Sequence, residues 1–126
     1  MSRFDGRRKA HDKAEEKVMD IIRPFTTRRH LPDRWVAFNN KLCAWDMKTT
    51  IFVEDNSRNE YFRLISEGIP VFIVYQNDGI TLAEWVQRLV WIGPLPPTKK
   101  STSGDPYYRI SGGISLLEFL EKAKDL

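Results

Sequence analysis

The alternation of apolar and polar residues divides the chain into helical and extended segments. From about Lys9 to Ile22, apolar residues recur every three or four positions, which predicts a helix that ends before Pro24. Residues 34–38 and 42–53 are instead rich in Trp, Phe, Val and Thr, and Asn39-Asn40-Lys41 lies between them. This composition predicts a β-hairpin closed by a tight turn.

Helix-capping signals and one apolar run organise the rest of the chain. Capping boxes, in which Ser or Thr is followed three residues later by Glu, begin at Ser57, Thr81 and Ser115 and predict three helices. Residues 71–75 form a continuous apolar run, which is typical of a strand buried on both faces. Gly68 suits a helix end, residues 77–79 suit a turn, and residues 94–106 suit an exposed loop.

The predicted order of elements is helix, hairpin, helix, strand, helix, loop, helix. The strand–helix–strand passage from Asp46 to Tyr75 implies two parallel strands joined by a right-handed crossover. We therefore expect one α/β domain, residues 1–126, in which helices flank a mixed β-sheet. A chain of 126 residues can bury one substantial hydrophobic core but not two.

Composition excludes several classes of protein. One Cys and two His cannot build a disulfide framework or a four-ligand structural zinc site. The apolar runs are too short to span a bilayer, so no membrane association is expected. No apolar stretch follows the basic N-terminus, so we expect a cytoplasmic protein without a secretory signal.

The formal charge of +3 is unevenly distributed. Residues 1–30 hold nine basic and five acidic residues, and the remaining residues hold eleven and twelve, so the head is +4 and the body −1. Residues 1–9 form a basic arm, for which both an ordered and a disordered conformation are open. The side chains suited to phosphate contacts are Arg7, Arg8, Lys9, Arg28, Arg29, Lys99 and Lys100. The alternative is a solubilising tail.

Acidic residues and one lysine gather on the predicted hairpin. Asp46 and Lys48 are two residues apart on the second arm, so both side chains reach the same face of the sheet. Asp33 enters the first arm, and the short turn can bring it beside Asp46 on the neighbouring strand. Glu15 shares a helix face with the apolar Val18, which places it at the edge of the packed stripe.

This constellation suits metal-assisted phosphoryl chemistry. Carboxylates at the ends of adjacent strands are hard oxygen ligands of the kind that magnesium prefers, with Glu15 completing the shell directly or through water. A metal-bound water is a nucleophile near neutral pH. Lys48 could orient or deprotonate that water, or stabilise the transition state as a fixed cation.

Pro32-Asp33 followed by Asp46-Met47-Lys48 resembles the signature of the PD-(D/E)XK nucleases, over roughly residues 10–76. The resemblance implies a restriction-endonuclease-like fold and a magnesium-dependent DNA endonuclease, with manganese as a substitute. The chain is most similar to small phage and archaeal Holliday-junction resolvases, which implies branched DNA as substrate, a homodimer and, for a phage protein, the host cytoplasm. It also implies a metal contact from the Met47 carbonyl and a polar active-site role for Gln76. The strand that usually precedes the Pro-Asp pair is short or missing here.

Each of these residues also has an ordinary structural interpretation. Glu15-Glu16-Lys17 fits the same acid-x-Lys triplet by chance, and Glu16 competes with Glu15. Asp46 and Lys48 could be an exposed pair on a half-solvated strand, and Asp33 a turn residue after Pro. For the remaining candidates we favour solvated or core positions: His11, His30, Cys43, Trp45, Trp85 and Trp91. Two other functions stay open, a non-catalytic DNA-binding module of the same fold and a protein-interaction factor with a basic N-terminal arm.

Overall fold

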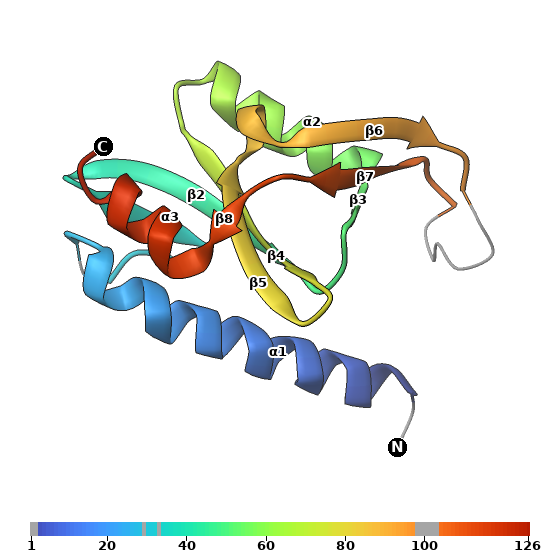
Figure 1. Cartoon of the computed structure of the whole chain (residues 1–126), viewed down its shortest axis with the longest axis horizontal. Coiled ribbons are helices and arrows are strands. Elements are labelled where there is room, and N and C mark those ends of the chain that lie inside the picture. The colour runs from blue at the N-terminus through green and yellow to red at the C-terminus, as the bar shows by residue number, and fades with distance from the viewer. Residues whose placement is uncertain (1–2, 29, 33, 98–103) are drawn as a thin grey trace.

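A long helix, α1 (Arg3–Ile22), opens the chain in a computed structural model that describes residues 3–28, 30–32, 34–97 and 104–126, with backbone only for residues 3–9 (Figure 1). The expected basic arm is therefore helical from Arg3 onward. Once a helix is nucleated, each added residue gains one hydrogen bond, and Arg and Lys are good helix formers. A 3-10 turn, η1 (Arg23–Phe25), follows at Pro24.

The predicted hairpin is formed by strands β1 (Trp35–Phe38) and β2 (Lys41–Lys48). Asn39 and Asn40 both have positive φ, 50° and 62°, as a two-residue hairpin turn requires. The second arm ends at Lys48 and not at residue 53, because the chain turns away there and β3 (Phe52–Glu54) pairs in another sheet. No strand precedes this hairpin in the described part of the chain.

A βαβ passage follows, as the sequence predicts. Helix α2 (Asp55–Ser66) links β2 to the parallel strand β4 (Val71–Asn77). The helix begins directly after β3, two residues before the expected cap at Ser57, and the Asp55 amide donates to the carbonyl of Pro106, the residue before Tyr107. Gly68 ends this segment with φ of +87°, a conformation that glycine adopts at low cost.

The helix predicted from Thr81 is wrong. Residues Ile80–Trp85 form strand β5, which turns back at Asn77-Asp78-Gly79 and pairs antiparallel with β4. Pairing satisfies the open edge of β4 and fully buries Ala83, which outweighs a local capping signal. A short 3-10 turn, η2 (Val86–Arg88), then leads into β6 (Val90–Leu95).

The expected loop over residues 94–106 is also only partly correct. Residues 94 and 95 belong to β6, and the missed strand β7 (Tyr107–Ser111) pairs with β6 and with β3. Residues 98–103, including Lys99 and Lys100, lie outside the described residues. The missed strand is short and half polar, and only its two neighbours in the second sheet make it extended.

Two sheets result, one of five strands in the order β1-β2-β4-β5-β8 and one of three in the order β3-β7-β6. Strand β8 (Ile114–Ser115) runs into helix α3 (Leu116–Ala123), where Ser115 accepts from the Glu118 amide as the capping box predicts. Helices α1 and α3 cover one face of the large sheet and α2 covers the other (Figure 1). The chain is thus α/β, with a mixed sheet flanked by helices. No described helix is long and apolar enough to cross a membrane.

An aromatic cage ties α2 to the small sheet. The guanidinium of Arg58 lies 4.6 Å from the ring centres of Phe62 and Tyr108 and 5.1 Å from that of Trp91. Such cation–π contacts favour arginine between flat rings. The cage fixes α2 against β6 and β7, and α2 in turn carries Tyr61 toward the large sheet.

Candidate functional site

Asp46 and Lys48 lie on one face of β2, as the alternation of the strand predicts. Lys48 Nζ lies 3.6 Å from Asp46 Oδ2. The Lys48 side chain is 25% exposed and the Asp46 side chain 17% exposed. The Met47 amide donates to Asp46 Oδ1 at 2.8 Å. Tyr61 of α2 donates its hydroxyl to Asp46 Oδ2. The Asp46 carboxylate is therefore half-buried and oriented by groups from two elements.

Arg34 joins this carboxylate to helix α1. Its guanidinium contacts Asp46 Oδ1 and lies 3.1 Å from Oε2 of Glu15. Arg34 has φ of +70°, a strained conformation for a residue with a side chain. Its carbonyl accepts from the Trp45 amide at 2.9 Å, which anchors the strained residue to β2. Glu15 and Asp46 thus converge on one positive group at the open end of β1.

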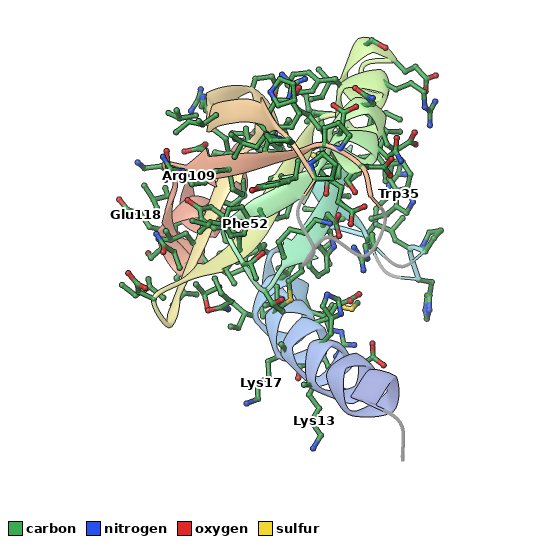
Figure 2. All side chains as sticks on the ribbon, turned by 90° about the vertical axis from the view of Figure 1, so that its right-hand side faces the viewer. Lys13, Lys17, Trp35, Phe52, Arg109 and Glu118 are labelled. Atoms are coloured by element: carbon green, nitrogen blue, oxygen red, sulfur yellow. The ribbon has the colours of Figure 1, made fainter. Side chains whose placement is uncertain are left out.

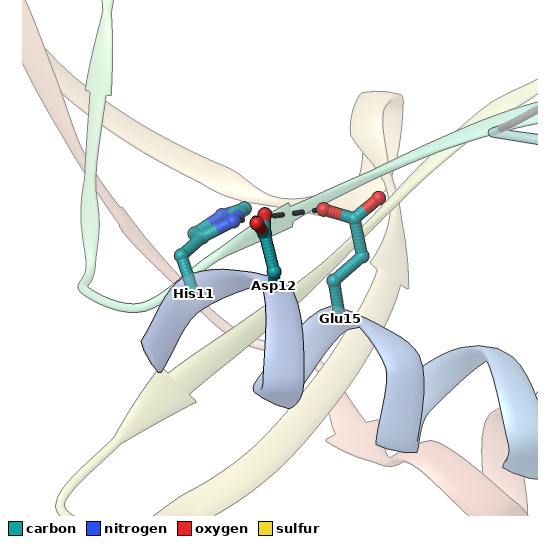
Figure 3. Close-up of side chains that lie close together, drawn as sticks. All are labelled: His11, Asp12 and Glu15. Atoms are coloured by element: carbon teal, nitrogen blue, oxygen red, sulfur yellow. Dashed lines mark ion pairs between the residues drawn. The ribbon is translucent and has the colours of Figure 1, made fainter. Parts of the chain in front are cut away.

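The surroundings of Glu15 add an imidazole and a further carboxylate (Figure 3). His11 Nδ1 lies 3.6 Å from Glu15 Oε2, one helical turn away. One ligand atom from each of His11, Asp12 and Glu15 falls within 4.8 Å of the others. All three come from one stretch of α1, and Asp12 is exposed, so their proximity reflects helical spacing.

The environment changes the acidity of two side chains in the site. Burial lowers the pKa of the Lys48 ammonium, the charge of Glu54 opposes that shift, and Arg34 adds to it. Burial raises the pKa of the Tyr61 hydroxyl, so the phenol stays protonated and keeps donating to Asp46.

The structure does not bring every predicted residue to this place. Asp33 and Arg29 lie outside the described residues. Gln76 is on the opposite face of the sheet from Asp46. Side chains alternate along β4, so Gln76 shares a face with Val74, which packs under α1 and α3. The Nε2 of Gln76 donates to Thr81 Oγ1 at 2.7 Å. The expected active-site role of Gln76 is therefore not supported by its position.

The predicted phosphate contacts are described only in part. Arg7, Arg8 and Lys9 belong to the first turns of α1, and of their side chains nothing is described. Arg28 is exposed. Lys13 and Lys17, on the same helix, point away from the sheet (Figure 2). Glu16, the competitor of Glu15, is also exposed and does not share the contact with Arg34.

The ordinary interpretations hold for several other residues. Cys43 and Trp45 are buried, with 0% and 3% of their surfaces exposed, and Trp85 packs against the same core. Burial raises the pKa of the Cys43 thiol from 9.0 to about 11, which makes it a poor nucleophile. Trp91 lies on β6 and packs in the aromatic cage of Arg58.

Sequence reasoning missed two residues of the site, Arg34 and Tyr61. Arg34 directly follows the Pro32-Asp33 pair, but no local pattern says which carboxylates its long side chain contacts. Tyr61 lies on the apolar side of its helix, and only 5% of its surface is exposed. What the sequence lacks is the register that places its hydroxyl beside Asp46.

Glu15 and Asp46 are candidate ligands of one divalent cation, because both contact the same guanidinium. Both offer hard oxygen atoms, and both already face one cationic group, so the donor set fits magnesium. No family model matches the sequence, and no curated protein is significantly similar to it.

Proposed function

We propose that this protein is a magnesium-dependent DNA endonuclease with a restriction-endonuclease-like fold. One observation carries the proposal: carboxylates from α1 and β2, Glu15 and Asp46, converge on a single cationic position beside Lys48. The βαβ passage through α2 and the antiparallel β1–β2 hairpin support the fold assignment. The motif Pro32-Asp33 with Asp46-Met47-Lys48 supports the reaction class.

The residues divide the work in a simple way. Glu15 and Asp46 would hold the metal, and Asp33 and the Met47 carbonyl join them on the strength of the sequence motif alone. Bound Mg²⁺, or Mn²⁺ in its place, would supply an activated water and offset charge on the phosphodiester. Lys48 would hold its ammonium beside the reacting phosphate, and Tyr61 would keep Asp46 in position.

The Arg34 side chain would take a second position when a metal ion binds. Its side chain is 38% exposed, so it can turn outward when a cation takes its place between the carboxylates. A displaced guanidinium is well suited to bind a phosphate oxygen of the substrate. In the alternative, a non-catalytic DNA-binding module, Arg34 would neutralise Glu15 and Asp46 permanently.

Branched DNA cut by a homodimer is the substrate and assembly we favour. The chain carries basic side chains for phosphate contacts, including Arg28, and no described element has the arrangement of a base-reading motif. Two copies would be needed to cut two strands symmetrically.

Cleavage assays test the proposal directly. A labelled four-way junction and a linear duplex are incubated with the protein, with and without Mg²⁺. The wild type should cut the junction only with the metal, and Asp46→Asn should not cut. Asp20→Asn, which removes an exposed carboxylate paired with Arg23, is the matched control and should cut normally.

Other outcomes separate the alternatives. If the wild type cuts neither substrate with Mg²⁺ or Mn²⁺, the enzyme proposal fails. A gel shift that survives Asp46→Asn would then favour the binding module. Equal cutting of both substrates would leave a nuclease and remove the preference for junctions.

A further inference from the structure

A hollow of about 340 Å³ opens beside the candidate site, between the end of α1 and the start of β1. Its lining is mainly apolar, with Met19, Trp35 and Trp45 among the apolar side chains, and it includes the basic Arg23, Arg28 and His30. The volume is at the lower end of the roughly 300–1,000 Å³ range of small-molecule sites. Buried Trp45 and Val36 belong to its lining together with the half-buried Leu31 and Trp35.

Residues that line the hollow are close in sequence to residues of the candidate site. Trp35 directly follows Arg34, and Met19 lies one helical turn beyond Glu15 on the same face of α1. One turn of helix rises about 5.4 Å, so a ligand in the hollow would lie close to a group held at Glu15.

The chemistry of the lining selects a flat apolar ligand that carries negative charge. Indole and thioether side chains pack well against an aromatic ring. Arg28 and His30 are exposed and form no ion pair with any residue that the structure describes, whereas Arg23 is paired with Asp20 at 2.6 Å. A nucleobase attached to a phosphate matches both features, and base–aromatic stacking contributes about 1–3 kcal/mol per base.

We propose that this hollow binds one unpaired nucleotide of a DNA strand, with the base against Trp35 and Leu31 and the phosphate on Arg28 and His30. The proposal rests on the proposed nuclease function and adds that a nucleotide next to the cleaved bond is unpaired, either in the free DNA, as in a flap, or where a branch point opens on binding. In a regular duplex the base is stacked and paired, so the hollow stays unused and affinity depends on the backbone contacts alone.

Equilibrium binding in EDTA, where no cleavage occurs, tests this. The probes are a duplex with a short single-stranded flap that contains 2-aminopurine at its first unpaired position, and a duplex with 2-aminopurine in the paired region. Binding should change the fluorescence of the flap probe and leave that of the paired probe unchanged. No change with either probe would overturn the proposal.

Two variants and a matched control locate the site. Leu31→Asp places a carboxylate in the hollow, and Arg28→Ala removes a positive charge from its lining; each should weaken flap binding by about tenfold, with a smaller effect on duplex. Arg88→Ala removes an equal charge from an exposed arginine in η2 and should affect both probes alike. If Leu31→Asp and Arg28→Ala weaken flap and duplex equally, these residues contact only the backbone and the proposal is wrong.

The two proposals fail in different ways. Loss of the nuclease function would appear as absent Mg²⁺-dependent cleavage with normal flap binding. Loss of the nucleotide site would appear as normal cleavage with no difference between flap and duplex in EDTA. Circular dichroism of each variant separates unfolding from loss of binding.

Discussion

Arg34 should compete with the metal for the carboxylates, so removing it should tighten metal binding. In Arg34→Gln the contacts to Glu15 and Asp46 are lost, and nothing else in the described site neutralises both carboxylates. The side chain is 38% exposed, so solvent screens both contacts. Each is then worth about 0.5–1 kcal/mol, and together about 1–2 kcal/mol.

Loss of these contacts should lower the stability of the metal-free protein and raise its affinity for Mg²⁺. Without metal, Arg34→Gln should lower the free energy of unfolding by about 1–2 kcal/mol, which lowers Tm by several degrees in a chain of this size. With metal, a cation no longer has to displace the guanidinium, so the Mg²⁺ affinity should rise about 5- to 30-fold. Calorimetric titration with Mg²⁺ and with Ca²⁺, together with melting curves in EDTA, measures both.

Arg63→Gln is the matched control. Arg63 also bridges two carboxylates, Glu60 at 2.5 Å and Glu67 at 2.9 Å, but on the exposed face of α2. Its loss should leave the metal affinity unchanged. If Arg34→Gln binds Mg²⁺ no more tightly than Arg63→Gln, Glu15 and Asp46 are not the metal ligands and the reasoning is refuted.

Three further changes test the surroundings of the site and the core. Tyr61→Phe should cost about 1–2 kcal/mol in urea unfolding, equally at pH 6 and pH 9, because burial keeps the pKa of the phenol high; a cost confined to one pH would contradict this. The raised pKa of Cys43 means that the folded chain binds more protons than the unfolded chain between about pH 9 and 11. The stability of the wild type relative to Cys43→Ala should therefore be constant below pH 9 and fall by about 2–3 kcal/mol toward pH 11, and a flat difference in urea unfolding would refute the burial argument. Arg58→Ala should destabilise the chain by about 1–3 kcal/mol and Arg58→Lys by less, since lysine keeps the charge and loses the planar stacking; melting curves equal to those of the wild type would show that the aromatic cage does not need its cation.

Local chemistry predicted several elements well. Side chains alternate along an extended strand, so the shared face of Asp46 and Lys48 follows from their spacing alone. The Asn39-Asn40 turn and the Ser115 cap were also predictable, because both depend on conformations or hydrogen bonds within four residues. These signals describe a segment without reference to its partners.

The wrong helix prediction at Thr81 shows that a local capping signal does not determine secondary structure by itself. Thr81 and Ser115 carry the same capping pattern, yet only Ser115 heads a helix. Strand β4 offers an open edge next to Thr81, and the hydrogen bonds and burial along β5 exceed the value of one cap, which is about 1 kcal/mol. The sheet edge that decided the outcome lies outside any local window.

The sequence by itself determined the α/β class, the hairpin, the crossover through α2 and the pairing of Asp46 with Lys48 on one strand face. Only the tertiary structure decided that Arg34 bridges Glu15 and Asp46, that Tyr61 donates to Asp46, and that Gln76 faces the other way. The physical reason is the sequence separation over which each kind of interaction acts. Periodicity and capping act over a few residues, whereas the contacts of Arg34 and Tyr61 join residues 12 to 19 positions apart and depend on how α1 and α2 pack on opposite faces of one sheet.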